Sequence, residues 1–258
     1  MNLININQFQ IIAFVLVLLR CIGFFISWSL FSGNNVPSPL KILLSLLVAL
    51  ICFAMIAPES YPAVDQYQTI IALGIKEAII GVSMGFLTNL IFHAVSMAGE
   101  LISMSMGLSA AQIFNPAMNM QQSSVNQLYF FLAALLFLGI RGHHYFLMGL
   151  VESFKLIPLN VILPRMSQMG EFALLGQKVI EVGLMLAAPV MVSILLVNFS
   201  LGIMGRAVPQ INVLITSLPV NALMGFSVLI IILPFFMDSL KTEIVEFSEI
   251  LFGYLKVY

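Results

Sequence analysis

The sequence predicts an all-α, polytopic protein in which about six long apolar helical segments fold as hydrophobic hairpins. Of its 258 residues, 61% are hydrophobic and 8% are charged, and the mean hydropathy is +1.09. Soluble domains carry about 25% charged residues, so this chain lacks the charge needed to cover a soluble globule. The net charge of -1 gives no sign of nucleic-acid binding. We therefore expect a single membrane domain over residues 1–258, or a subunit buried in a large apolar assembly.

Apolar runs long enough to cross a membrane predict the helices. Turn-forming prolines and glycines separate these runs, including Pro37, Pro116 and Pro209. Beyond the last run, residues 238–258 form an amphipathic and modestly acidic tail, which predicts an interfacial or docking helix. The predicted apolar segments lie near residues 8–32, 40–57, 72–107, 125–150, 177–204 and 211–237.

The third segment carries small and polar residues three or four positions apart, which places them on one face of a helix. Gly81 and Gly85 form a small-xxx-small pattern that is typical of close helix packing. Asn89, His93 and Glu100 predict contact with a polar partner face or a channel. The complete stripe consists of Gly81, Gly85, Asn89, His93, Ser96, Glu100, Ser103 and Gly107.

Residues 101–140 contain no acidic residue, no basic residue and no histidine, yet the middle of this window is rich in amides, serines and methionines. A loop in open water normally accumulates charge, and a lipid-facing segment cannot hold so many amides. A wet but uncharged segment suits a water-accessible cavity with protein walls. This feature indicates a conduit rather than a catalyst.

Two arginines stand among apolar residues. Arg20 lies inside the first apolar run, where a charge is costly unless it has a partner. We expect a structural ion pair with Glu77, Glu100 or Glu181, and the sequence does not choose among them. Arg206 is the single charge near the tip of the last hairpin, and it can either reach lipid headgroups or pair with a neighbouring subunit.

Patterns that would indicate catalysis or metal binding are weak. His143 and His144 are adjacent, so on a helix they point about 100° apart and cannot both face one metal ion. Ser109 follows a glycine as in a nucleophile turn, but no histidine follows His144 to serve as its base. Cys21 and Cys52 lie in apolar runs and are expected to act as small hydrophobic residues. We predict no enzymatic activity, no metal and no cofactor.

Several motifs follow one another along the whole chain, and their order and spacing are more informative than any one of them. They include Arg20-x-x-Gly23, Glu77-x-x-x-Gly81-x-x-x-Gly85-Phe86 and Gly142-His143-His144. The most specific motif is Gly202-x-x-x-Arg206-Ala-Val-Pro209-Gln210-Ile-Asn212-Val213. Together they resemble the FliR family of flagellar type III export-gate proteins, whose injectisome relatives are called SctT. A mild departure is Thr216-Ser217-Leu218 before Pro219, where the family pattern has a glycine and an aromatic residue.

The resemblance implies a non-enzymatic subunit of an export gate in the bacterial inner membrane, within the flagellar basal body. Proteins of this family assemble with FliP-like and FliQ-like subunits, and with a FlhB-like subunit, into a helical pore-forming complex for unfolded export substrates. The complex sits largely above the lipid.

The resemblance also implies that the loop after the Gly-Leu-Ser motif plugs the closed pore. On this chain the plug corresponds to residues 107–122, most of the charge-free segment. Methionines can repack around irregular chains, and an uncharged lining does not retain charged substrates. A glycine and a proline shape the turn. The predicted plug residues are Met106, Gly107, Phe114, Asn115, Pro116, Met118 and Met120.

Other interpretations remain open at this point. A small-molecule secondary transporter or permease would fit helices interrupted at Pro189 and near Gly81, together with Arg20. The two halves of the sequence show no evident repeat, which argues against it. An assembly scaffold is a third hypothesis, in which the uncharged loop is an ordinary connection that tolerates deletion.

Overall fold

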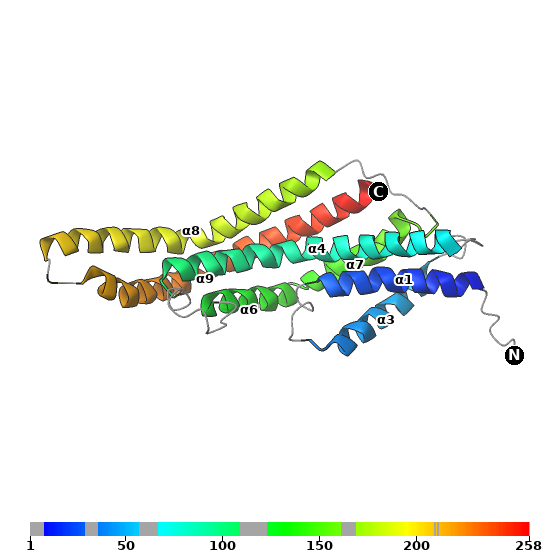
Figure 1. Cartoon of the computed structure of the whole chain (residues 1–258), viewed down its shortest axis with the longest axis horizontal. Coiled ribbons are helices and arrows are strands. Elements are labelled where there is room, and N and C mark those ends of the chain that lie inside the picture. Colours follow the sequence, from blue (N-terminus) through cyan, green and yellow to red (C-terminus); the bar gives the residue numbers. More distant parts are fainter. Residues whose placement is uncertain are drawn as a thin grey trace. The chain divides into compact units, whose positions relative to one another are not determined.

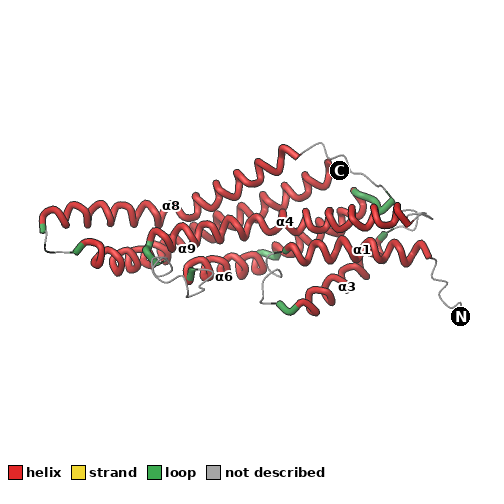
Figure 2. The backbone as a smooth tube through the Cα atoms, viewed as in Figure 1, coloured by secondary structure: helices red, strands yellow, loops and turns green. Residues whose placement is uncertain are grey.

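The computed structural model describes residues 8–28, 36–56, 67–108, 123–160, 169–208, 210 and 212–257. Within these ranges the chain forms seven α-helices and no strand, so the predicted all-α class is confirmed (Figures 1 and 2). Five of these helices are long and apolar enough to cross a membrane, or up to six spans if α6 and α7 count as one. The helices are α1 (Gln8–Ser27), α3 (Ser38–Met55), α4 (Tyr67–Ser105), α6 (Ser124–Gly139), α7 (Gly142–Leu156), α8 (Met169–Ala207) and α9 (Val213–Val257).

The apolar segment predicted over residues 125–150 consists of two helices separated by a short break. Helix α6 ends at Gly139 and α7 begins at Gly142. Between them Arg141 adopts a left-handed conformation, with φ of 59°. A left-handed residue cannot continue a right-handed helix, so the chain changes direction there. Apolar composition alone does not reveal this break, because it continues on both sides.

The amphipathic tail over residues 238–258 lies within α9 as far as Val257. Helix α9 runs from Val213 to Val257 and contains Pro219 and Pro234. At 45 residues it is more than twice the length of about 20 residues that a membrane span requires. An interfacial or docking role for the tail stays a prediction.

The helices form two compact units. Unit 1 comprises residues 1–90, 141–169 and 245–258, and unit 2 comprises residues 91–140 and 170–244. Helices α4 and α9 each contribute residues to both units. The single domain expected over residues 1–258 stays a prediction.

In unit 1 the core is built around one face of α1. Phe24 and Trp28 are almost completely buried, and their ring centroids lie 5.1 Å apart. Phe14 of α1 meets Phe53 of α3 edge to face, with centroids 5.6 Å apart. The contact of Phe14 with Phe53 attaches α3 to α1, while most of the apolar surface of α3 remains exposed, including Ile51.

In unit 2 the core is built from aromatic pairs and close helix approaches. Phe92 of α4 contacts Phe137 of α6, and Tyr129 of α6 contacts Phe236 of α9, with centroid separations of 5.5 Å and 4.7 Å. A Cβ atom at Gly99 would lie 2.6 Å from the Cα atom of Asn126, so α4 and α6 pack backbone against backbone.

Helices α8 and α9 present a large apolar surface outside the core of unit 2. Leu195 and Phe199 of α8 and Ile230 of α9 are each more than 65% exposed. The side-chain nitrogen of Asn221 in α9 donates a hydrogen bond to Oδ1 of Asn198 in α8 at 2.9 Å. This bond pairs two polar groups in apolar surroundings. Exposed apolar area on this scale is typical of a surface that contacts lipid or protein partners.

Candidate functional site

A buried group of charged side chains joins three helices of unit 1, and we call it the Arg20 cluster. Arg20 of α1 is fully buried, and its Nε donates to Oε2 of Glu77 in α4. Its two terminal nitrogens donate to Ser153 Oγ in α7 and to the carbonyl of Ile157, each at 3.0 Å. The guanidinium also lies over the ring of Phe154, 4.2 Å from the centroid.

Lys76 is the second cation of the Arg20 cluster. Its Nζ lies 2.7 Å from Oε1 of Glu77 and donates to the carbonyl of Pro158 at 3.1 Å. The cluster therefore holds two cations and one carboxylate. The carbonyls of Ile157 and Pro158, at the C-terminal end of α7, offset the additional positive charge, because a helix ends in unpaired carbonyls of partial negative charge. The cluster caps α7 and attaches it to α1 and α4.

The structure selects Glu77 among the three carboxylates that the sequence offered to Arg20. The contributions of Lys76 and Ser153 were not predicted. A signal for Lys76 was present, because it is a charged residue in an apolar helix next to Glu77 and needs a partner for the same reason as Arg20. No comparable signal identifies Ser153, since serine occurs often in apolar helices.

The glycines of the α4 stripe allow α1 to pack closely against α4. A Cβ atom at Gly81 would overlap the carbonyl oxygen of Arg20, and one at Gly85 would lie 2.5 Å from the carbonyl oxygen of Phe24. On the opposite helix, a Cβ atom at Gly23 would lie 2.9 Å from the carbonyl oxygen of Ala78. In unit 1 the small residues of the stripe therefore serve helix packing.

The polar members of the stripe lie in different environments. Asn89 is half-buried, and its Oδ1 has no hydrogen-bond partner in the described part of the chain. His93 is exposed and Glu100 is half-buried. Contact of these three side chains with a polar partner face or a channel stays a prediction.

Helix α4 ends in a Schellman motif at Gly107. The amide of Leu108 donates to the carbonyl of Ser103 at 3.1 Å, and the amide of Gly107 donates to the carbonyl of Met104 at 3.0 Å. Gly107 has φ of 76°, which is the left-handed conformation that this motif requires. Met106 is fully buried in unit 2, where its side chain occupies the space beside Gly225 of α9. The segment that follows thus leaves α4 from a defined position.

Gly107→Ala should destabilise the end of α4. A Cβ atom there would lie 2.8 Å from a methyl carbon of Leu218, and the left-handed conformation costs a non-glycine residue about 1–2 kcal/mol. We expect a lower Tm for the purified chain in detergent. Gly139→Ala is the matched control, because a Cβ atom at Gly139 meets no atom within 4 Å. Equal Tm values for the two variants would contradict the strain assigned to Gly107.

The remaining predicted plug residues lie outside the described residues, which omit 109–122. On the far side of this segment Ser123 caps α6, and its Oγ accepts a hydrogen bond from the amide of Asn126 at 3.1 Å. Both ends of the segment therefore belong to unit 2, one at the end of α4 and the other at the start of α6. The predicted plug residues in this segment are Phe114, Asn115, Pro116, Met118 and Met120.

Arg206 lies in the last turn of α8 and is exposed. Within the described ranges it has no ion pair. Asn212 starts α9, where its Oδ1 accepts from the amide of Ile215 at 3.3 Å. Both predicted uses of Arg206, contact with headgroups and pairing with a neighbouring subunit, remain open.

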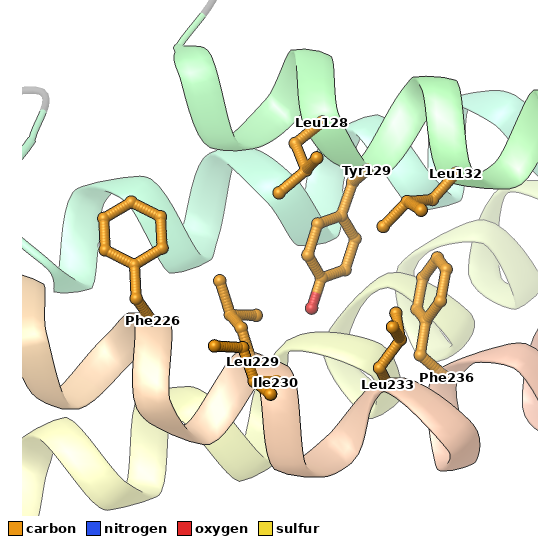
Figure 3. Close-up of a pocket in the computed structure, with 8 residues that line it drawn as sticks. All are labelled: Leu128, Tyr129, Leu132, Phe226, Leu229, Ile230, Leu233 and Phe236. Carbon is orange, nitrogen blue, oxygen red and sulfur yellow. The ribbon is translucent and has the colours of Figure 1, made fainter.

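An apolar groove of about 220 Å³ lies in unit 2 between α6 and α9 (Figure 3). The hydroxyl of Tyr129 points into it and is the one polar side-chain group of the lining. Such a surface offers no acid, base or nucleophile for catalysis, and it suits apolar contacts. The groove is lined by Leu128, Tyr129, Leu132, Phe226, Leu229, Ile230, Leu233 and Phe236.

Comparisons with known proteins point to one family. A family model described as bacterial export proteins, family 1, matches residues 11–247. The flagellar biosynthetic protein FliR of Bacillus subtilis is 32% identical over 223 residues, which cover 85% of each chain. The protein of the same name from Escherichia coli is 27% identical over 88% of this chain and 87% of its own length. That from Aquifex aeolicus is 26% identical, with 93% and 92% covered.

Proposed function

Because the chain belongs to family 1 of the bacterial export proteins, we propose that it is a non-enzymatic subunit of the flagellar type III export gate and contributes to a gated pore for unfolded substrates. Membership confirms the resemblance to FliR drawn from its motifs, and it makes the chain a flagellar export protein. The pore, the plug and the gate partners do not follow from family membership, and they form the proposal.

The observation that carries the proposal is the uncharged segment between α4 and α6. It is rich in amides and methionines, and it starts at the Schellman motif of Gly107 and ends at the cap formed by Ser123. A segment with fixed ends and an uncharged, wettable middle can cover an opening when the gate is closed. It can also move aside without leaving fixed charges in the path of the substrate.

The exposed apolar surfaces support an assembly with unlike partners in the inner membrane. Helices α3, α8 and α9 leave many large hydrophobic side chains exposed, among them Ile51, Phe199 and Ile230. A chain with so little charge needs lipid or other apolar subunits to cover these faces. We infer that FliP-like and FliQ-like subunits, and a FlhB-like subunit, contribute to this cover within the flagellar basal body.

The test is ion leakage through the membrane of cells that express the chain with its FliP-like and FliQ-like partners. Deletion of residues 110–121 should produce a leak that is absent with the intact chain, because the opening loses its cover. The leak should require the partners, since this subunit forms the pore only with them.

Two controls separate a plug from other causes of leakage. The deletion chain expressed without partners should not leak, and the deletion combined with Arg20→Ala should not leak because the gate no longer assembles. An assembled complex that carries the deletion and shows no leak would overturn the plug. A leak without partners would instead favour a self-sufficient transporter or permease.

A further inference from the structure

The apolar groove between α6 and α9 in unit 2 has no part in the proposed plug (Figure 3). The most buried residues of its lining are Tyr129, Leu229 and Phe236, which are 3%, 8% and 2% exposed. The most exposed is Ile230, at 75%. A depression with buried lining residues and exposed apolar walls is typical of a surface that binds an apolar partner.

The hydroxyl of Tyr129 is a buried polar group in this apolar lining. It points into the groove, and no residue in the described part of the chain forms a hydrogen bond with it. The contact of its ring with Phe236, at 4.7 Å between centroids, fixes the position of the hydroxyl. Because a buried tyrosine hydroxyl usually has a hydrogen-bond partner, the occupant of the groove is expected to supply one.

Helix α9 contributes a second polar group beside the groove. Pro234 lies inside α9 and has no amide hydrogen, so the carbonyl of Ile230 lacks its usual donor four residues later. In apolar surroundings, side chains of neighbouring helices commonly satisfy such carbonyls. Hydroxyl and amide side chains can both donate and accept, so they match this carbonyl and the hydroxyl of Tyr129.

The spacing of the lining residues matches the surface of a helix. The wall on α9 includes Phe226, Ile230 and Leu233, which are separated by four and three positions. On α6, Leu128 and Leu132 are four positions apart. Such spacing is typical of helices that receive the side chains of a facing helix. A volume of about 220 Å³ is smaller than one helical turn, whose diameter is about 10–12 Å and whose pitch is about 5.4 Å. The groove therefore fits the side chains on one face of a helix.

Charge complementarity restricts the occupant further. Neither α6 nor the part of α9 from Val213 to Met237 contains a charged residue. A charged helix face would be buried here without a counter-ion, and an anionic lipid headgroup would find no cation. A lipid acyl chain could fill the groove, but it would leave the hydroxyl of Tyr129 without a partner. The walls therefore match an uncharged helix that carries a hydroxyl or amide side chain.

We propose that the groove is the docking site for one apolar, uncharged helix of another gate subunit, which places a hydroxyl or amide side chain opposite Tyr129. The large apolar side chains of this helix enter the groove between α6 and α9, and its polar side chain exchanges a hydrogen bond with the tyrosine. The docking site rests on the proposed function, because its occupant comes from the assembly of the export gate.

The first test is photocrosslinking in membranes of cells that express the full chain with its FliP-like and FliQ-like partners. Ile230→p-benzoylphenylalanine places a photoreactive side chain on the exposed wall of the groove. We expect an adduct with an uncharged, apolar segment of a partner subunit, identified by mass spectrometry after digestion. The absence of a protein adduct, or adducts only with lipid, with a second copy of this chain or with residues 109–122, would overturn the proposal.

Tyr129→Phe tests the hydrogen bond, because it removes only the hydroxyl. The Tm of the purified chain in detergent should stay unchanged, since the hydroxyl has no partner in the described part of the chain. The amount of partner subunit retained by the chain after solubilisation should fall about threefold or more. Tyr145→Phe is the matched control, because Tyr145 is 46% exposed on α7 in unit 1. Equal retention in the two variants would contradict the docking site.

Failure of the docking site and failure of the proposed function give different results. If the parent chain forms no complex with the FliP-like and FliQ-like subunits, the proposed function is wrong and the docking site is wrong with it. If the parent complex forms and leaks on deletion of residues 110–121, while Tyr129→Phe retains its partners and Ile230 gives no partner adduct, only the docking site is wrong.

Discussion

Arg20→Ala should strongly destabilise the folded chain, lowering the free energy of unfolding by about 3 kcal/mol or more. The substitution deletes the donors to Ser153 and Ile157 and leaves a cavity where the guanidinium lay over Phe154. Lys76 still faces Glu77, so the carboxylate keeps one partner, but α7 loses the contacts that Arg20 makes with Ser153, Phe154 and Ile157. The measurement is the Tm of the purified chain in detergent, which should fall by roughly 6–12 °C.

Arg206→Ala is the matched control for this prediction, because Arg206 is an exposed arginine at the end of α8. Its loss should change the Tm little, since an exposed charge contributes about 0–1 kcal/mol. If Arg20→Ala and Arg206→Ala lower the Tm equally, the Arg20 cluster does not stabilise unit 1. Loss of gate assembly should follow the loss of stability in the first variant.

Gly81→Ala should be comparably damaging, although it adds only one methyl group. Its Cβ atom would overlap the carbonyl oxygen of Arg20, which is backbone and cannot rotate away. Helix α1 would have to move outward, and this shift would pull Arg20 away from Glu77. Overpacking commonly costs about 1–3 kcal/mol, and we expect the upper end of this range because both the packing and the ion pair suffer. Reduced protease resistance of the chain in membranes would report the loss.

Gly202→Ala makes the same chemical change as Gly81→Ala, but we expect it to leave protease resistance intact. Gly202 lies in α8, and a Cβ atom there meets no atom within 4 Å. Alanine favours the helix by about 0.5–1 kcal/mol relative to glycine, so this variant should be as resistant as the parent chain or more so. A similar loss of resistance in Gly81→Ala and Gly202→Ala would show that α1 and α4 do not pack as closely as described.

Local features of the sequence were enough to predict the all-α class, the apolar helices and the close packing at Gly81 and Gly85. Hydropathy, helical periodicity and turn residues act over a few neighbouring positions, so they can be recognised without tertiary contacts. A helix bend was one interpretation of Arg141-Gly142-His143-His144, but the left-handed conformation of Arg141 does not follow from the apolar pattern around it.

The sequence by itself determined that the chain must be covered by lipid or partners, that Arg20 needs an internal partner and that the segment after α4 is polar without charge. These properties follow from composition and from the cost of an isolated charge in apolar surroundings. Tertiary structure alone decided that Arg20 pairs with Glu77 and that Lys76 joins them. Each of these contacts joins residues at positions set by the crossing and rotation of whole helices. Packing of many side chains fixes that geometry, and no short stretch of sequence contains it.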